Sequence, residues 1–226
     1  MRYIGETITM IVLVGVFGTD IDRHPQVSPA DACLAHRCQR LGEALGLRDV
    51  AVFRWDHPFP NAIPIGGPTD GVLLVSTPLI ELLSDAQLEA ALAHELAHLR
   101  HGDSRRLLWI GGACLSLAVG LIHRIGGRSR RRRLLVSMVV LLPTILGLLG
   151  VLRVFERQAD RSAVAVTGDE RALAGAIIAV RTGRDDVDVR NYDPPRERSV
   201  GRLLSMYPRL EDRFPSIFDE QPADGP

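Results

Sequence analysis

Two long uncharged segments constrain the fold of this chain more than any other feature. Residues 107–122 and 134–152 contain no charged side chain and are joined by a segment rich in arginine. As helices they would measure about 24 and 28 Å, close to the thickness of the hydrocarbon core of a bilayer. The alternative, two helices buried in a protein core, requires more surrounding apolar material than a chain of 226 residues supplies. We therefore expect a transmembrane hairpin over residues 106–152, in contact with the lipid bilayer.

The charge balance limits the kinds of partner that the chain can bind. Lysine and arginine number 27 in total and aspartate and glutamate also number 27, so the formal net charge is 0. Such a chain has no basic excess with which to bind a phosphate backbone. We therefore expect no nucleic-acid partner.

The two ends of the chain carry little information about function. The N-terminal segment, residues 1–27, contains an apolar run at residues 8–18. This run is too short to cross a bilayer as a helix, which needs about 20 apolar residues. It is compatible either with a core strand or with a short membrane anchor. At the other end, residues 220–226 are expected to form a disordered tail.

Between the N-terminal segment and the hairpin, the apolar pattern predicts a helix followed by strands. Residues 28–47 show helical spacing, and Pro29 suits the first turn of such a helix. Residues 50–53, 62–65 and 72–75 are short apolar runs separated by proline and glycine clusters that are typical of turns. Strands connected in this way predict a small antiparallel sheet.

A predicted helix from Ser84 to about Gly102 carries the chemistry. It begins with a capping-box pattern and contains the HExxH sequence formed by His94, Glu95 and His98. Two histidines four residues apart project from one face of a helix, so both can bind one Zn²⁺ ion. Glu95 lies beside them, where its carboxylate can take a proton from a zinc-activated water without binding the metal itself.

A catalytic zinc ion needs a third protein ligand, and the segment after the second apolar run supplies candidates. Glu156 and Asp160 are four residues apart, so on a helix they share one face. A hairpin that returns beside the HExxH helix would bring both carboxylates to the metal. We expect Glu156 to be the third ligand and Asp160 to orient a zinc histidine, His94, through its ring N–H.

Four segments resemble, in the same order, the HtpX-like branch of the membrane gluzincin metallopeptidases, a family that also contains the CAAX prenyl protease. They are PNAIPIGG at residues 60–67, LEAALAHELAHLRHGD at 88–103, ERQAD at 156–160 and SMYPRLEDR at 205–213. The resemblance implies an α+β gluzincin zinc-peptidase domain, mainly helical with a small antiparallel sheet. The two parts of this domain, residues 28–105 and 153–219, would flank the transmembrane hairpin.

The resemblance also implies an activity and a mode of substrate binding. The family consists of membrane-bound zinc endopeptidases, so we expect one Zn²⁺ per chain and hydrolysis of peptide bonds in membrane-associated or unfolded proteins. A protein or peptide substrate in extended conformation would pair with an edge strand that includes Asn61, Ala62 and Ile63.

The C-terminal motif departs from the family pattern at one position. Where the family usually has histidine before proline, this chain has Tyr207. If the family histidine stabilises the oxyanion of the reaction, the hydroxyl of Tyr207 can take its place. Arg209 and Arg213 are alternative donors to the oxyanion, or else each forms a structural ion pair or is solvated.

The resemblance implies a multi-pass protein of the cell membrane with its catalytic domain on the cytoplasmic side. The arginines do not decide the orientation, because six lie around the hairpin loop and six flank the catalytic ends of the two spans. Two other functions stay open from the sequence. The chain could be a catalytically silent sensor or binding protein with the same fold, or a processing protease of narrow specificity.

Overall fold

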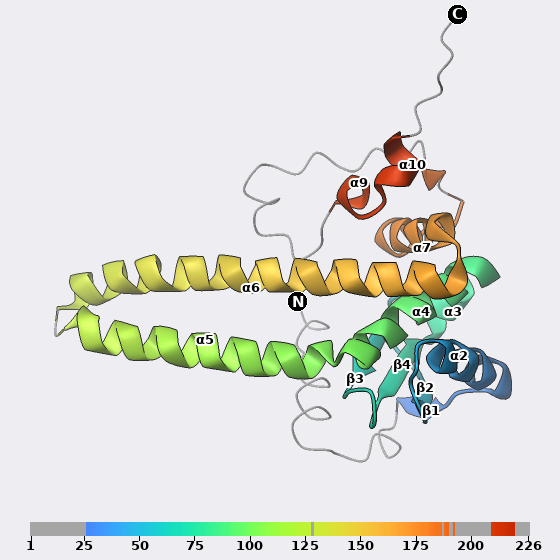
Figure 1. Ribbon diagram of the computed structural model, residues 1–226, viewed down its shortest axis with the longest axis horizontal. Helices are drawn as coiled ribbons and strands as arrows, with labels where there is room; N and C mark the ends of the chain where they lie inside the picture. Colours follow the sequence, from blue (N-terminus) through green and yellow to red (C-terminus); the bar gives the residue numbers. More distant parts are fainter. Residues whose placement is uncertain (1–25, 128, 187, 190–191, 193–208, 220–226) are drawn as a thin grey trace, which may run out of the picture.

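The computed structural model describes residues 26–219, apart from residues 128, 187, 190–191 and 193–208. The apolar run at residues 8–18, the expected tail at residues 220–226 and Tyr207 therefore lie outside the described residues. The described chain forms a body of helices packed on a sheet and a long helical hairpin that projects from this body (Figure 1).

The hairpin consists of α5, Asp103–Gly126, and α6, Arg130–Thr167. Both helices are long and apolar enough to cross a membrane. Their apolar side chains face outward, because Trp109, Leu117 and Met138 are 78%, 73% and 72% exposed. The hairpin is therefore not the core of the body, and a lipid environment would cover its apolar surface.

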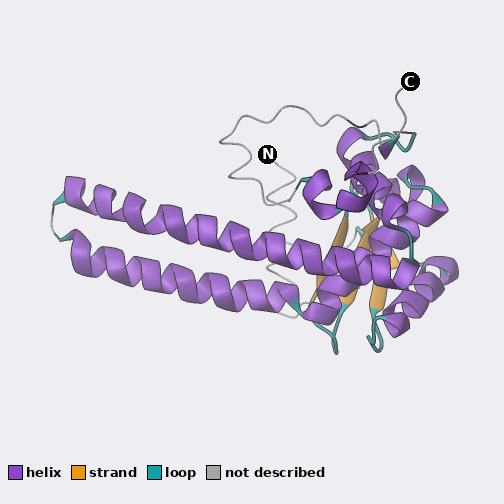
Figure 2. Ribbon diagram, turned by 45° about the horizontal axis from the view of Figure 1, so that its top comes forward, coloured by secondary structure: helices purple, strands orange, loops and turns teal. Residues whose placement is uncertain are grey.

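The second hairpin helix does not end where the uncharged segment ends. The uncharged segment predicts a helix over residues 134–152, whereas the structure has one helix of 38 residues that continues to Thr167. No proline or glycine occurs between residues 151 and 167 to interrupt it. The helix ends at Gly168, whose φ of 69° belongs to the left-handed region that glycine adopts readily. The last turns of α6 thus run from the hairpin into the body (Figures 1 and 2).

The body contains a sheet with the strand order β1-β2-β4-β3. The strands are β1 (Val27–Pro29), β2 (Ala51–Trp55), β3 (Ala62–Ile65) and β4 (Val72–Ser76). The edge strands β1 and β3 are antiparallel to their neighbours, whereas the central strands β2 and β4 are parallel to each other. Figure 2 shows the sheet at the base of the hairpin, beside the helices of the body.

The prediction of an antiparallel sheet is wrong for the central pair of strands. The turn clusters do reverse the chain after β2 and again after β3, as the sequence indicates. However, β3 lies at the edge of the sheet rather than beside β2, so β4 occupies the position between them and runs parallel to β2. Turn residues specify a change of direction, but they do not specify which strands become neighbours.

The first helix begins later than the sequence predicts. Ser28 and Pro29 belong to β1, and the helix α2 spans Ala32–Ala44. Asp31 is its N-cap, since its side chain accepts a hydrogen bond from the backbone N–H of Leu34. An aspartate at the N-cap satisfies a helix donor that would otherwise be unpaired, whereas Pro29 is also compatible with an edge strand.

The central helix of the body is α4, Asp85–His101, which contains the HExxH sequence. It begins with the predicted capping box at Ser84 and ends at Gly102, as the sequence predicts. The other helices that lie wholly within the body are shorter. They are α3 (Thr77–Leu82), α7 (Glu170–Thr182), α9 (Leu210–Arg213) and α10 (Pro215–Asp219).

Small side chains allow α6 to lie close to α4. Ala93 and Ala97 on α4 and Ala159 and Ala163 on α6 are all 0% exposed and belong to one apolar core. Since alanine adds little volume between helices, the two backbones can approach closely. This packing brings the ERQAD segment of α6 beside the HExxH segment of α4.

Candidate metal centre

The two histidines of the HExxH sequence lie on one face of α4. The Nε2 atoms of His94 and His98 are 3.2 Å apart, and their ring planes are nearly perpendicular, at 87°. His94 is buried and His98 is half-buried. The four-residue spacing on a helix predicts this juxtaposition.

The helix α6 brings Glu156 to the same point. Its Oε2 atom lies 3.6 Å from His94 Nε2, and its Oε1 atom lies 3.8 Å from His98 Nε2. Three ligand atoms on one tetrahedral ion, each about 2.0–2.2 Å from it, are separated by about 3.3–3.6 Å. The observed separations of 3.2 to 3.8 Å are close to these values. The group of His94, His98 and Glu156, here called the metal cluster, can therefore hold a metal ion.

The second ring nitrogen of each histidine faces a carboxylate. His94 Nδ1 lies 3.0 Å from Asp160 Oδ1, and His98 Nδ1 lies 2.8 Å from Asp103 Oδ2. A neutral imidazole whose Nδ1 proton is directed at a carboxylate keeps its Nε2 lone pair for a metal ion. Two lone pairs and the Glu156 carboxylate then converge on one point, an arrangement that a bound cation stabilises.

Asp103 has no predicted role in the sequence analysis. It is the first residue of α5 and is only 5% exposed. The chain turns at Gly102, and this turn places Asp103 beside the last turn of α4. The available signal was an acidic residue five positions after the second histidine, directly beyond the glycine that ends the helix.

Arg213, at the end of α9, connects the C-terminal segment to the metal cluster. Its side chain is 2% exposed. Its Nε and Nη2 atoms donate to the two carboxylate oxygens of Asp160 at 2.7 and 2.5 Å, and Nη2 lies 3.5 Å from Glu156 Oε2. Of the two arginines considered as oxyanion donors, Arg213 therefore forms a buried ion pair, whereas Arg209 is exposed at the start of α9.

These contacts shift the pKa values of the buried groups. Burial alone would lower the pKa of His94, but its contacts with Asp160 and Glu156 outweigh burial and raise it. Burial alone would raise the pKa values of Glu156 and Asp160, but His94 and Arg213 outweigh it and lower both. Both carboxylates are therefore ionised at neutral pH, and their charge favours a bound cation.

Glu95 is half-buried beside the metal cluster. Desolvation raises the pKa of its carboxyl group, and the nearby His94 and His98 only partly offset this rise. A carboxylate with a raised pKa holds a proton more readily than an exposed one. Glu95 is therefore suited to accept and release a proton at this position.

The predicted substrate-binding residues belong to β3 or directly adjoin it. Ala62 and Ile63 belong to β3, which is an edge strand, and Asn61 directly precedes it. His101 is half-buried and its Nε2 lies 3.5 Å from Ser162 Oγ, so it contacts α6 at a position outside the metal cluster. Tyr207 lies outside the described residues.

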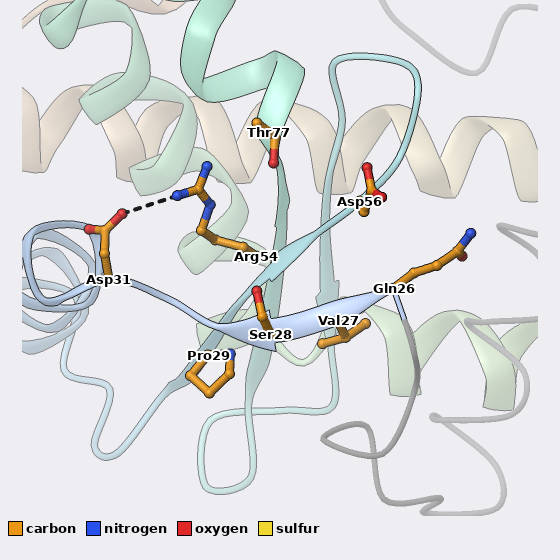
Figure 3. A pocket seen from close by; sticks show the side chains of 8 residues that line it. All are labelled: Gln26, Val27, Ser28, Pro29, Asp31, Arg54, Asp56 and Thr77. Atoms are coloured by element: carbon orange, nitrogen blue, oxygen red, sulfur yellow. Dashed lines mark ion pairs between the residues drawn. The ribbon is translucent and has the colours of Figure 1, made fainter.

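A pocket elsewhere on the body lies at the opposite edge of the sheet, beside β1 (Figure 3). Its charged residues include Arg54 and Asp31, whose Nη1 and Oδ2 atoms are 3.6 Å apart. The strands β1 and β3 form the two edges of the sheet, so this pocket lies away from the strand that the sequence connects with substrate binding.

Comparison with known proteins supports a common family for most of the chain. The model of Peptidase family M48 matches residues 32–220. "Protease HtpX homolog" of Acidiphilium cryptum is 30% identical over 204 residues, which cover 84% of this chain and 69% of that protein. "Protease HtpX homolog" of Moorella thermoacetica is 27% identical over 249 residues, which cover 95% of this chain and 83% of that protein.

A solved structure shows a similar fold. The crystal structure of S. mikatae Ste24p matches with a TM-score of 0.63 and 18% sequence identity. The match covers 95% of this chain but 56% of the Ste24p chain. At this identity the similarity concerns the fold alone. The match to the family model and the HtpX relatives together show that the chain is an HtpX-like member of peptidase family M48.

Proposed function

We propose that the chain is a membrane-bound zinc endopeptidase that hydrolyses peptide bonds in membrane-associated or unfolded proteins. The observation that carries this proposal is the metal cluster, in which His94, His98 and Glu156 meet with a carboxylate on the far nitrogen of each histidine. Membership of peptidase family M48 supports it independently. The exposed apolar hairpin supports the membrane location.

In this proposal the residues of the chain divide the chemistry among them. His94, His98 and Glu156 would bind one Zn²⁺, which would supply a Lewis acid and lower the pKa of water. Glu95 takes a proton from the attacking water as it adds to the carbonyl carbon of the peptide bond. Glu95 then gives that proton to the leaving amine.

Asp160 and Asp103 act in this proposal by fixing the two imidazole rings. Each carboxylate holds the proton on Nδ1, so that the Nε2 lone pair points to the ion. Arg213 holds Asp160 in turn through two hydrogen bonds. Tyr207 is proposed to stabilise the oxyanion through its hydroxyl. Arg209, which is exposed and lies two residues further along the chain, is an alternative donor to the oxyanion.

Removal of zinc is the direct test of the proposed activity. We expect detergent-solubilised protein to contain about one zinc per chain and to cleave unfolded casein. A chelator should abolish the cleavage, and one equivalent of zinc should restore it. Cleavage that persists after complete removal of zinc would contradict the proposal, and zinc binding without cleavage of any substrate would favour a silent binding protein.

The pattern of cleavage separates two kinds of protease. Cleavage sites mapped on a mixture of unfolded proteins should be scattered if the enzyme acts in quality control. A single repeated site would instead indicate a processing protease of narrow specificity.

Removal of either supporting carboxylate should weaken zinc binding. We expect Asp103→Asn and Asp160→Asn each to lower the zinc affinity about 10- to 100-fold, because each histidine loses the charge that orients its ring. Competition with a chromogenic zinc chelator would measure the affinity. Asp186→Asn is the matched control, since Asp186 is exposed and paired with Arg184 far along the chain. Parent-like affinity in Asp103→Asn would contradict the role given to Asp103.

We further propose that the body lies on the cytoplasmic side, as the resemblance to HtpX-like proteins implies, and Cys33 provides a test of this location. Cys33 is exposed on the body, whereas burial raises the pKa of Cys38 to about 12 and so suppresses its reactivity. In a Cys114→Ser variant, a membrane-impermeant maleimide should label Cys33 only after the cells are permeabilised. Labelling of Cys33 in intact cells would place the body on the outer side.

A further inference from the structure

The backbone of β3 alternates between the sheet and its open edge. The backbone N–H of Ser76 donates to the carbonyl of Asn61 at 2.9 Å, and the N–H of Asn61 donates to Ser76 Oγ at 2.8 Å. Asn61 therefore directs its backbone groups toward β4. Because successive residues of a strand point in opposite directions, Ala62 directs its N–H and carbonyl away from β4.

The next outward-facing residue of β3 is Pro64, which cannot donate a hydrogen bond. Pro64 lies opposite Leu73 of β4, two positions from the pair Ala62 and Val75. Its carbonyl accepts a hydrogen bond from Ser104 Oγ of α5 at 3.3 Å. By the same alternation, the preceding outward position is Pro60, which also lacks an N–H. Among the described residues of this edge, Ala62 therefore has both a backbone N–H and a backbone carbonyl that can form hydrogen bonds with a substrate.

This edge lies next to the metal cluster. Ser104 donates a hydrogen bond to the Pro64 carbonyl and directly follows Asp103 in the chain. Asp103 in turn lies 2.8 Å from His98. One turn at the start of α5 therefore holds both the end of β3 and a histidine of the cluster. A peptide that pairs with the open edge of β3 would lie alongside the cluster.

We infer that the substrate backbone pairs with β3 at one residue only, Ala62, and that Pro64 and Ser104 end the ladder there. This inference rests on the proposed peptidase function and specifies its substrate class. A site with a single paired residue binds a short extended segment of the substrate. It needs only one backbone N–H of the substrate, which donates to the carbonyl of Ala62. The site therefore accepts a substrate with proline two residues before or after the residue that pairs with Ala62. A longer ladder would reject such a substrate, because proline has no backbone N–H to donate.

A pair of substitutions tests the inference on a fluorogenic peptide taken from a casein cleavage site. Pro64→Ala supplies a second outward N–H, so KM should fall about two- to tenfold while kcat stays within twofold. Ser104→Ala frees the Pro64 carbonyl to accept a substrate N–H. In a series of peptides that each carry one N-methyl group, the parent enzyme should lose cleavage activity at one methylated position. Ser104→Ala should lose activity at a second position as well, two residues from the first.

The outcomes separate this inference from the proposed function. Pro68→Ala makes the same chemical change in an exposed loop outside the strand and should leave KM unchanged. The single-residue ladder is wrong if N-methylation at two positions, spaced two residues apart, already reduces cleavage by the parent enzyme. It is also wrong if Pro64→Ala leaves KM unchanged, as Pro68→Ala should. Neither result would contradict the proposed peptidase activity. If no peptide is cleaved by zinc-loaded parent protein, the peptidase proposal itself fails, and the inference fails with it.

Discussion

Glu95→Gln should lower kcat/KM for an unfolded substrate by about 10²- to 10⁴-fold, the usual contribution of a general base. Glutamine matches the size of glutamate but cannot accept a proton from water at neutral pH. Glu95 is not among the residues that form the metal cluster. The variant should therefore still bind about one zinc per chain.

The measurement compares cleavage rate and zinc content in the parent and the variant. Glu89→Gln is a matched control, because Glu89 lies on the same helix and forms a surface ion pair with Arg40 at 2.9 Å. Surface pairs of this kind contribute little, so the activity of this control should stay within twofold of the parent. If Glu95→Gln retains more than a tenth of the parent activity, Glu95 is not the general base. If the variant instead loses zinc, its loss of activity carries no information about proton transfer.

Arg213→Met should destabilise the protein by about 3–5 kcal/mol in the absence of metal. The side chain of Arg213 is 2% exposed and neutralises two carboxylates, Asp160 and Glu156, that are themselves largely buried. Methionine fills similar space but leaves these carboxylates without their guanidinium partner. Breaking a buried ion pair by removing one member costs more than removing both, because the remaining charge stays desolvated.

Thermal unfolding in detergent measures this effect. For a chain of this size a loss of about 3–5 kcal/mol corresponds to a fall in Tm of roughly 6–20 °C. Arg209→Met is the control, since Arg209 is exposed and only four residues away; its Tm should change by less than about 2 °C. Excess zinc should reduce the difference between Arg213→Met and the parent, because the metal also compensates the charge of Glu156. Equal Tm values for the two variants would contradict the role given to Arg213.

The helical hairpin and the metal cluster are structurally connected in this chain. Asp103 is the first residue of α5, and Glu156 and Asp160 lie in the part of α6 that enters the body. Both hairpin helices therefore place a carboxylate against a histidine of α4. The continuity of α6 from the apolar segment to Asp160 fixes the position of these carboxylates relative to the hairpin.

Much of this arrangement was predictable from local sequence patterns. The uncharged segments predict the hairpin, the capping box predicts the start of α4, and the spacing of His94 and His98 predicts that they share a face. Glu156 and Asp160 were also predictable as a pair, because a hairpin must return to the point where it leaves. These features depend on spacing within one element or on the simplest connection between two.

The features that the sequence did not predict depend on tertiary contacts. The parallel pairing of β2 and β4 depends on where β3 joins the sheet, which the turn residues do not specify. Asp103 contacts His98 through the geometry of the turn at Gly102. An ion pair of Arg213 was one of the alternatives from the sequence, but its partner Asp160 was not predicted, because the two residues are 53 positions apart and have no mutual spacing signal.

Zinc X-ray absorption on fully loaded protein can show directly whether His94, His98 and Glu156 are the zinc ligands. We expect two imidazole nitrogens at about 2.0–2.1 Å and a carboxylate oxygen at about 2.0–2.2 Å from zinc, with no sulfur at about 2.3 Å. His98→Ala should remove one imidazole or abolish zinc binding altogether. A sulfur ligand, or an unchanged zinc environment in His98→Ala, would show that the metal binds elsewhere and would contradict the assignment of the centre.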